Sequence, residues 1–89
     1  MKRFTVYIMG HKPPGWVPDK RKMEELINAA DFCVANSYGV EVGQSFTIGE
    51  TVYPGRNGVK PPVPGSSVKV VEVKEQGKVA VIEVLSEPS

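Results

Sequence analysis

The most regular feature near the start of the chain is an alternation of apolar side chains. Phe4, Val6 and Ile8 occupy every second position, which predicts a β-strand with one face in the core, because successive side chains of a strand point to opposite faces. Gly10 ends this pattern. The segment 10–18 that follows contains three prolines and predicts a loop, since proline lacks the backbone N–H that a helix interior needs.

After Asp19 the apolar spacing changes to that of a helix. The apolar side chains now recur at i, i+3, i+4 and i+7, which places them on one helical face; they are Met23, Leu26, Ile27 and Ala30. Asp19 is a favourable N-cap for this segment. The pattern therefore predicts an amphipathic helix over residues 20–30, packed against a sheet by Met23, Leu26 and Ile27.

The middle of the chain shows shorter extended segments. Residues 32–35 predict a short strand. Phe46, Ile48 and Val52 share one phase of a second extended segment, and the Gly49-Glu50 pair inside it is compatible with either a bulge or a tight turn. Residues 54–65 contain four prolines and three glycines, which predicts a long, stiff loop.

The last third of the chain predicts a β-hairpin. Two valine-rich runs, 68–74 and 78–85, are separated by a turn at Gln76-Gly77. A two-residue turn there pairs Val73 with Ala80 and Val71 with Ile82, so these four side chains are expected on the core side. The opposite face mixes polar side chains with further apolar ones, including Val68, Val70 and Val79. A sheet with apolar residues on both faces is expected to be curled or barrel-like.

These elements predict one α+β domain spanning residues 1–89, with one amphipathic helix packed on a mainly antiparallel, curled sheet of about five strands. The valine-rich hairpin after the Pro-Gly-Ser turn at residues 64–66 resembles, in its general pattern, SH3-like and OB-like small barrels. Both are architectures that host many unrelated functions. The resemblance therefore implies a fold and no particular activity.

Length and composition narrow the classes of protein. A chain of 89 residues has room for one domain, and 40% hydrophobic with 24% charged residues is typical of globular proteins. The net charge of +1 argues against a general polyanion binder, which needs an excess of Lys and Arg. No apolar run approaches the ~20 residues that cross a bilayer. We expect no membrane segment and a cytoplasmic location.

No residue pattern predicts a catalytic or metal centre. His11 is the only histidine and has no adjacent carboxylate, serine or cysteine, so we interpret it as an ordinary surface or loop-packing residue. Cys33 is the only cysteine, which excludes an internal disulfide and a cysteine-based zinc cluster. Its place in an apolar strand predicts a buried, unreactive thiol. We expect a protein that is not an enzyme and that uses neither a cofactor nor a metal.

The charges are divided along the chain. Residues 1–22 carry six Lys or Arg and one Asp, a net charge of +5, whereas residues 23–53 carry five acidic groups and no basic one, a net charge of −5. Lys20, Arg21 and Lys22 open the predicted helix, where cations oppose the helix macrodipole. This triplet either attracts an anionic partner or is a solvated helix start, offset by the two glutamates that follow four residues later.

Two loops, 10–18 and 54–65, hold the remaining candidate binding residues and seven of the eight prolines. Loops stiffened in this way lose less entropy when a partner docks. Trp16 in the first loop either offers a stacking platform for a base or, as we favour, packs over the helix. The stretch 59–64 of the second loop is either an extended ligand for an aromatic groove or, as we favour, a rigid connection.

The sequence therefore favours a binding module whose surface is built from loops, acting as a protein-interaction domain or as an accessory or regulatory subunit. The candidate binding residues are Lys12, Trp16, Lys20, Arg21, Lys22, Arg56 and Lys60. The alternative is a nucleic-acid or anion-binding module that uses the basic N-terminal region, provided that the acidic block lies elsewhere in space. A small enzyme requires His11 to meet a carboxylate in a pocket. No motif specifies the partner or the oligomeric state.

Overall fold

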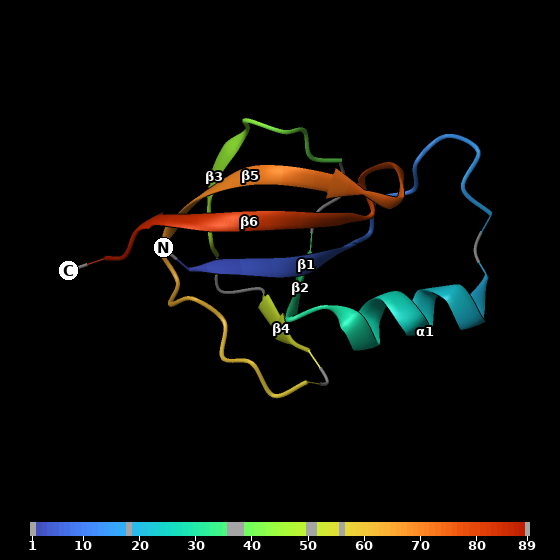
Figure 1. The fold of residues 1–89 in the computed structure, drawn as a ribbon, viewed down its shortest axis with the longest axis horizontal. Helices are drawn as coiled ribbons and strands as arrows, with labels where there is room; N and C mark the ends of the chain where they lie inside the picture. The colour runs from blue at the N-terminus through green and yellow to red at the C-terminus, as the bar shows by residue number, and fades with distance from the viewer. Residues whose placement is uncertain (1, 18, 36–38, 50–51, 56, 89) are drawn as a thin grey trace.

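The computed structural model describes residues 2–17, 19–35, 39–49, 52–55 and 57–88. Within this part of the chain there are one α-helix, six strands and one short 3-10 turn (Figure 1). The elements in chain order are β1 (Arg3–Met9), α1 (Lys20–Ala29), β2 (Phe32–Ala35), β3 (Ser45–Thr47), β4 (Val52–Pro54), β5 (Ser67–Lys74), η1 (Glu75–Gly77) and β6 (Val79–Ser86).

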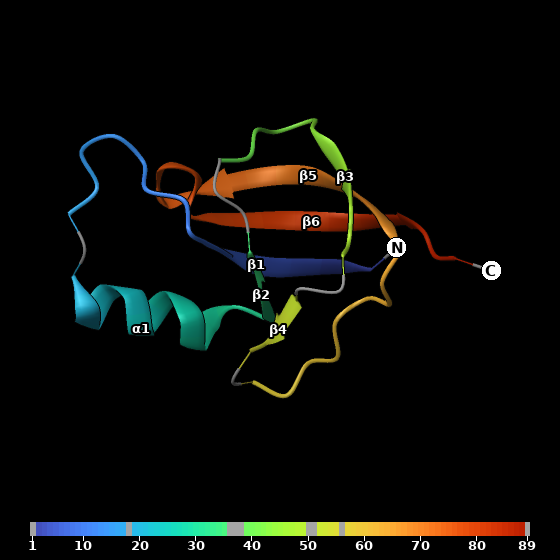
Figure 2. The ribbon, with the colours of Figure 1, turned by 180° about the vertical axis from the view of Figure 1, so that it is seen from behind.

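The six strands form one sheet in the order β3-β5-β6-β1-β2-β4. β1 and β2 are parallel, and the other four pairs are antiparallel. The sheet curls into a half-barrel, and both chain termini lie at the end opposite α1 (Figures 1 and 2). The α+β fold with one helix and a mainly antiparallel, curled sheet is therefore confirmed.

The structure has six strands rather than about five, because two strands, β3 and β4, form where the sequence predicts one extended segment. β3 and β4 flank the Gly49-Glu50 pair, yet β3 pairs with β5 and β4 pairs with β2, at opposite ends of the strand order. Gly49 therefore belongs to the connection between the two edges of the sheet. Glu50 lies outside the described residues, and with it the choice between a bulge and a tight turn. A local pattern cannot show the separation of β3 from β4, because the pairing partner of a strand is set by the whole topology.

β1 lies near the middle of the sheet, and its residues 6–8 are buried on both faces. Val6 and Ile8 are fully buried in the larger core cluster, which lies inside the curl. Tyr7 points to the other face, where it is 2% exposed in a second cluster beneath α1. The predicted alternation of β1 is confirmed, and the helix explains why its second face is buried as well.

The larger cluster is built by strands and connecting segments without α1. Phe32 packs edge-on against the ring of Phe4, with 5.5 Å between ring centroids. The buried members of this cluster are Val6, Ile8, Phe32, Val40, Ile48, Val68, Val70, Ala80 and Ile82. The inside of the curl is therefore filled by the sheet and its own connections.

The helix begins where the sequence predicts. The carboxylate of Asp19 accepts hydrogen bonds from the backbone N–H groups of Arg21 (2.9 Å) and Lys22 (3.4 Å), which satisfies two of the unpaired donors of the first turn. Leu26 and Ile27 are half-buried against the second cluster, which contains Tyr7, Ala30, Cys33 and Val79. None of the ten residues of α1 is fully buried. The helix is therefore attached through a narrow apolar stripe.

The β5–β6 hairpin turns at the place that the sequence predicts, but the connection is longer than two residues. Lys74 and Val79 are the last paired residues, and the four residues between them include the 3-10 turn η1. Glu75 (φ 51°), Gln76 (φ 60°) and Gly77 (φ 97°) all occupy the left-handed region, which only glycine adopts at no steric cost, and the N–H of Lys78 donates to the carbonyl of Glu75 at 3.1 Å.

Counted from the turn toward the start of β5, the expected register holds as far as Glu72 and fails at Val71. Val73 pairs with Ala80 as predicted, but a β-bulge at Val71 makes Val70 the partner of Ile82. The pairing of Val71 with Ile82, and the place of Val71 on the core side, were therefore wrong. Because the bulge adds one residue to β5, Val68 and Val70 turn inward and are fully buried, although they were expected on the mixed face.

A pair of glycine variants tests the close approach of β4 to the α1–β2 connection. A Cβ at Gly55 would lie 2.5 Å from the carbonyl oxygen of Asp31 and 2.6 Å from that of Ala30, whereas a Cβ at Gly49 meets nothing within 4 Å. We expect Gly55→Ala to lower the free energy of unfolding by about 1–3 kcal/mol. The matched control Gly49→Ala should stay within about 0.5 kcal/mol. Urea unfolding measures both, and equal stabilities would contradict the close approach.

Candidate functional site

The structure separates the predicted binding residues into two regions. Lys12 and Trp16 lie in the β1–α1 loop, which leads into the first turn of α1 with its basic triplet (Figure 1). Lys60 lies in the β4–β5 loop, which runs away from the start of α1 toward the termini (Figures 1 and 2). Arg56 lies outside the described residues. The candidate cations that the structure describes therefore do not form one continuous face.

The basic region at the start of α1 is only partly available to a partner. Lys22 Nζ lies 3.4 Å from Glu75 Oε1, which ties the helix start to the β5–β6 turn. Arg21 Nε lies 3.8 Å from Glu25 Oε1, and its side chain is 90% exposed. Lys20 and Lys12 are exposed as well. A surface ion pair such as Arg21–Glu25 contributes little, so three cations at this end remain accessible.

The β4–β5 loop is fixed at both ends. At its start, Asn57 Nδ2 donates to Asp31 Oδ1 at 3.0 Å, and Asp31 Oδ2 accepts the backbone N–H of Thr5 at 2.8 Å. At its end, the backbone N–H of Gly65 donates to the carbonyl of Ile48, and the N–H of Ile48 donates to the carbonyl of Ser66, both at 2.8 Å. The buried Ser66 also donates through Oγ to the carbonyl of Val63 at 2.7 Å. These bonds attach both ends of the loop to the fold, and the prolines between them restrict its backbone.

Between these anchors, residues 60–64 form a proline ridge with a hollow on each side. Pro62 is buried, whereas Val63 is 45% exposed. One hollow has a volume of about 210 Å³ and is lined by Lys2, Phe4, Lys60, Pro61, Pro62, Val63 and Glu87. The other has a volume of about 260 Å³ and is lined by Gly49, Val52, Lys60, Pro61, Pro62, Val63 and Pro64.

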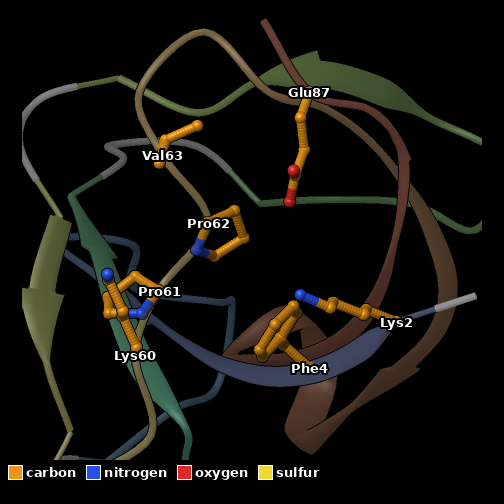
Figure 3. Close-up of a pocket in the computed structure, with 7 residues that line it drawn as sticks. All are labelled: Lys2, Phe4, Lys60, Pro61, Pro62, Val63 and Glu87. Atoms are coloured by element: carbon orange, nitrogen blue, oxygen red, sulfur yellow. The ribbon is translucent and has the colours of Figure 1, made fainter.

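The first hollow combines an apolar wall with charges of both signs. Figure 3 shows the ammonium group of Lys2 and the carboxylate of Glu87 reaching toward the hollow from the two ends of the chain, with Pro62 between them and Lys60. Phe4 supplies an aromatic surface whose ring is held by the core contact with Phe32. Such a surface suits a partner that has both apolar and charged groups.

Sequence reasoning identified Lys60 but missed Lys2, Phe4 and Glu87. These three residues come from the two ends of the chain, and only the fold brings them beside the proline ridge. No signal in the sequence marks them. The exposed Val63, by contrast, lies within the stretch 59–64 that the prolines had already distinguished.

A buried lysine is a further residue that the sequence did not reveal. Lys78 is 5% exposed, and its Nζ donates to the carbonyls of Ile8 (2.8 Å) and His11 (2.7 Å). The same atom lies 4.8 Å from the centroid of the Tyr7 ring. Burial lowers the pKa of Lys78. Burial, and then the neighbouring Cys33, raise the pKa of Tyr7.

His11 and Cys33, the two residues considered for chemistry, both pack against other parts of the protein. A Cβ at Gly39 would lie 2.8 Å from His11 Nε2, so the ring packs closely against that glycine, as a loop-packing histidine should. Cys33 is buried, with 4% exposure. Across the described ranges, no group of three or more His, Cys, Asp or Glu side chains is placed to hold a metal ion.

Comparison with known proteins finds no matching family model, no similar curated protein and no similar solved structure. In the part of the chain that the structure describes, no helix has the length and apolar character needed to span a membrane. The surface features themselves are therefore the ground for assigning a function.

Proposed function

We propose that the protein is a binding module without enzymatic activity that recognises another protein through the proline ridge. The observation that carries this proposal is the exposed Val63 on a loop fixed at both ends and flanked by two hollows. A rigid loop loses less entropy on docking than a mobile one. An accessory or regulatory role in a larger assembly fits a domain of this kind.

The size of the hollows supports a protein partner over a drug-sized ligand. Small-molecule sites usually enclose about 300–1,000 Å³, and the hollows beside the ridge measure about 210 and 260 Å³. Each has room for a single side chain of a partner. Lys2, Lys60 and Glu87 supply the polar rim that protein interfaces place around an apolar centre.

The proposal predicts that a charge at the ridge weakens binding. The partner is first identified by affinity purification from the native host, with nucleic acid analysed alongside protein. Val63→Asp should then lower the affinity for the purified partner by about tenfold or more, because it places a carboxylate at the centre of the apolar contact. The binding constants are measured by isothermal titration calorimetry.

The matched control is Val42→Asp. Val42 is 64% exposed in the turn before β3, so this variant makes the same chemical change away from the ridge. It should bind like the unmodified protein. Affinity that is unchanged within about twofold in Val63→Asp, or recovery of nucleic acid as the sole partner, would contradict the proposal.

A second candidate function is the binding of nucleic acid or another polyanion at the start of α1. It is favoured by the exposure of Lys12, Lys20 and Arg21 at one end of the molecule, with the half-buried Trp16 in the same loop. The exposed Glu24 and Glu25 on the same helix, and the pairing of Lys22 with Glu75, weigh against it.

This candidate predicts a salt-dependent affinity that depends on three cations. A variant with Lys12, Lys20 and Arg21 replaced by Ala should bind a labelled single-stranded oligonucleotide several-fold more weakly, with a shallower dependence on salt. Lys22 is retained because it holds the helix to the hairpin. Replacing the exposed Lys69 and Lys74 of β5 serves as the control. Unchanged fluorescence anisotropy in the triple variant would remove this surface from consideration.

A further inference from the structure

A third hollow lies between the end of β1 and α1, away from the proline ridge. Its volume is about 160 Å³, and it is lined by Tyr7, Met9, Gly10, Met23, Ile27 and Lys78. It exists because α1 rests on the sheet through a narrow stripe, which leaves space beneath Met23. The hollow is apolar except where Lys78 and Tyr7 meet it.

Lys78 brings to this hollow a buried cation without a counter-ion. Its ammonium group has three N–H donors, two of which bond the carbonyls of Ile8 and His11. Among the described residues no carboxylate pairs with it, and the neighbouring Glu75 is engaged by Lys22. A buried charge is costly unless it is paired, so the ammonium group of Lys78 favours the binding of an anion in the hollow.

Tyr7, which lines the same hollow, is a second buried residue with a polar group. Its hydroxyl is buried and has no hydrogen-bond partner among the described residues, whereas the large majority of buried side-chain polar atoms have one. The Tyr7 ring lies under the ammonium of Lys78, at 4.8 Å. The ammonium of Lys78 thus keeps one N–H donor without a hydrogen-bond partner among the described residues, over the face of the Tyr7 ring.

The remaining walls suit a short hydrocarbon. Met9 and Met23 are flexible, polarizable side chains that adapt to the shape of what they contact, and Ile27 adds an aliphatic surface. At ~30 Å³ per water molecule in the liquid, 160 Å³ corresponds to roughly five waters. That is the space of a chain of about six carbons, well below a drug-sized ligand.

We propose that this hollow binds a small apolar monocarboxylate, with its carboxylate on the ammonium of Lys78 and its hydrocarbon between Met9, Met23 and Ile27. The site is separate from the proline ridge, so ligand binding here is an additional property of the domain.

Sodium hexanoate is the probe, and hexan-1-ol is the neutral control with the same hydrocarbon chain length. Hexanoate should shift the ¹³C-methyl NMR signals of Met9 and Met23 in a saturable manner. Hexan-1-ol should bind about tenfold more weakly or worse, because it cannot pair with a buried cation. Lys78→Met should weaken hexanoate binding by about tenfold or more, whereas Lys69→Met, which removes an exposed charge from β5, should leave it unchanged.

Circular dichroism checks that Lys78→Met remains folded. If it does not, Met23→Phe takes its place, since this change fills the hollow from the half-buried side of the helix and should also weaken hexanoate binding by about tenfold. Three results would each overturn the proposal: equal binding of hexanoate and hexan-1-ol, no saturable shift at Met9 and Met23, or undiminished binding in a folded Lys78→Met or Met23→Phe protein.

Discussion

The burial of both faces of β1 is the constraint on which the rest of the structure depends. Val6 and Ile8 point into the curl and Tyr7 points under the helix, and all three have almost no exposure to solvent. A strand with two apolar faces is stable only when both are covered. One face is covered by the curling of the sheet on itself, and the other by α1. The parallel pairing of β1 with β2 follows from the same arrangement, because the chain must cross over through the helix to return alongside β1.

The single helix of the described residues covers only part of the outer face of the sheet. The ten-residue α1 reaches Tyr7, Cys33 and Val79 only through Leu26 and Ile27. Lys78 partly fills the remaining space: its side chain is buried, and its ammonium donates to the carbonyl of Ile8 in β1 and to that of His11 in the loop after it. The unfilled part is the hollow that we assign to a monocarboxylate. The inferred ligand site thus exists because α1 covers its face of the sheet incompletely.

The path of the β4–β5 loop determines the surface around the proline ridge. The β4–β5 loop must pass from one edge of the sheet toward the other, and it does so beside Phe4 and the two chain ends. Prolines and the anchors at Asp31 and Ser66 fix its path. A fixed loop with one exposed apolar side chain presents a docking surface at little conformational cost, which is why we assign the binding function to it.

The sequence patterns correctly predicted the elements that depend on interactions between neighbouring residues. The strand at β1, the capped helix after Asp19 and the place of the turn at Gln76-Gly77 each depend on neighbouring residues and were correctly expected. The bulge at Val71 was not expected, because the Val70-Val71 doublet places apolar side chains in both phases and leaves the register without a period-two signal.

The same distinction holds for the candidate sites. Lys60 lies in a loop that its prolines mark, so it was expected. Lys2 and Glu87 take their place from the meeting of the chain ends, and Lys78 is buried although a lysine beside a hairpin turn is normally exposed. Such placements depend on contacts between distant segments, which no local pattern contains.

Native-state hydrogen exchange tests most directly the claim that β1 holds the fold while α1 is only lightly attached. The account predicts that the amides of Tyr7 and Ile8 exchange only through global unfolding. The amides of residues 24–29 in α1 should exchange through a local opening whose free energy is lower by about 2 kcal/mol or more. Equal opening free energies for the two elements, or greater protection in α1 than in β1, would contradict the account.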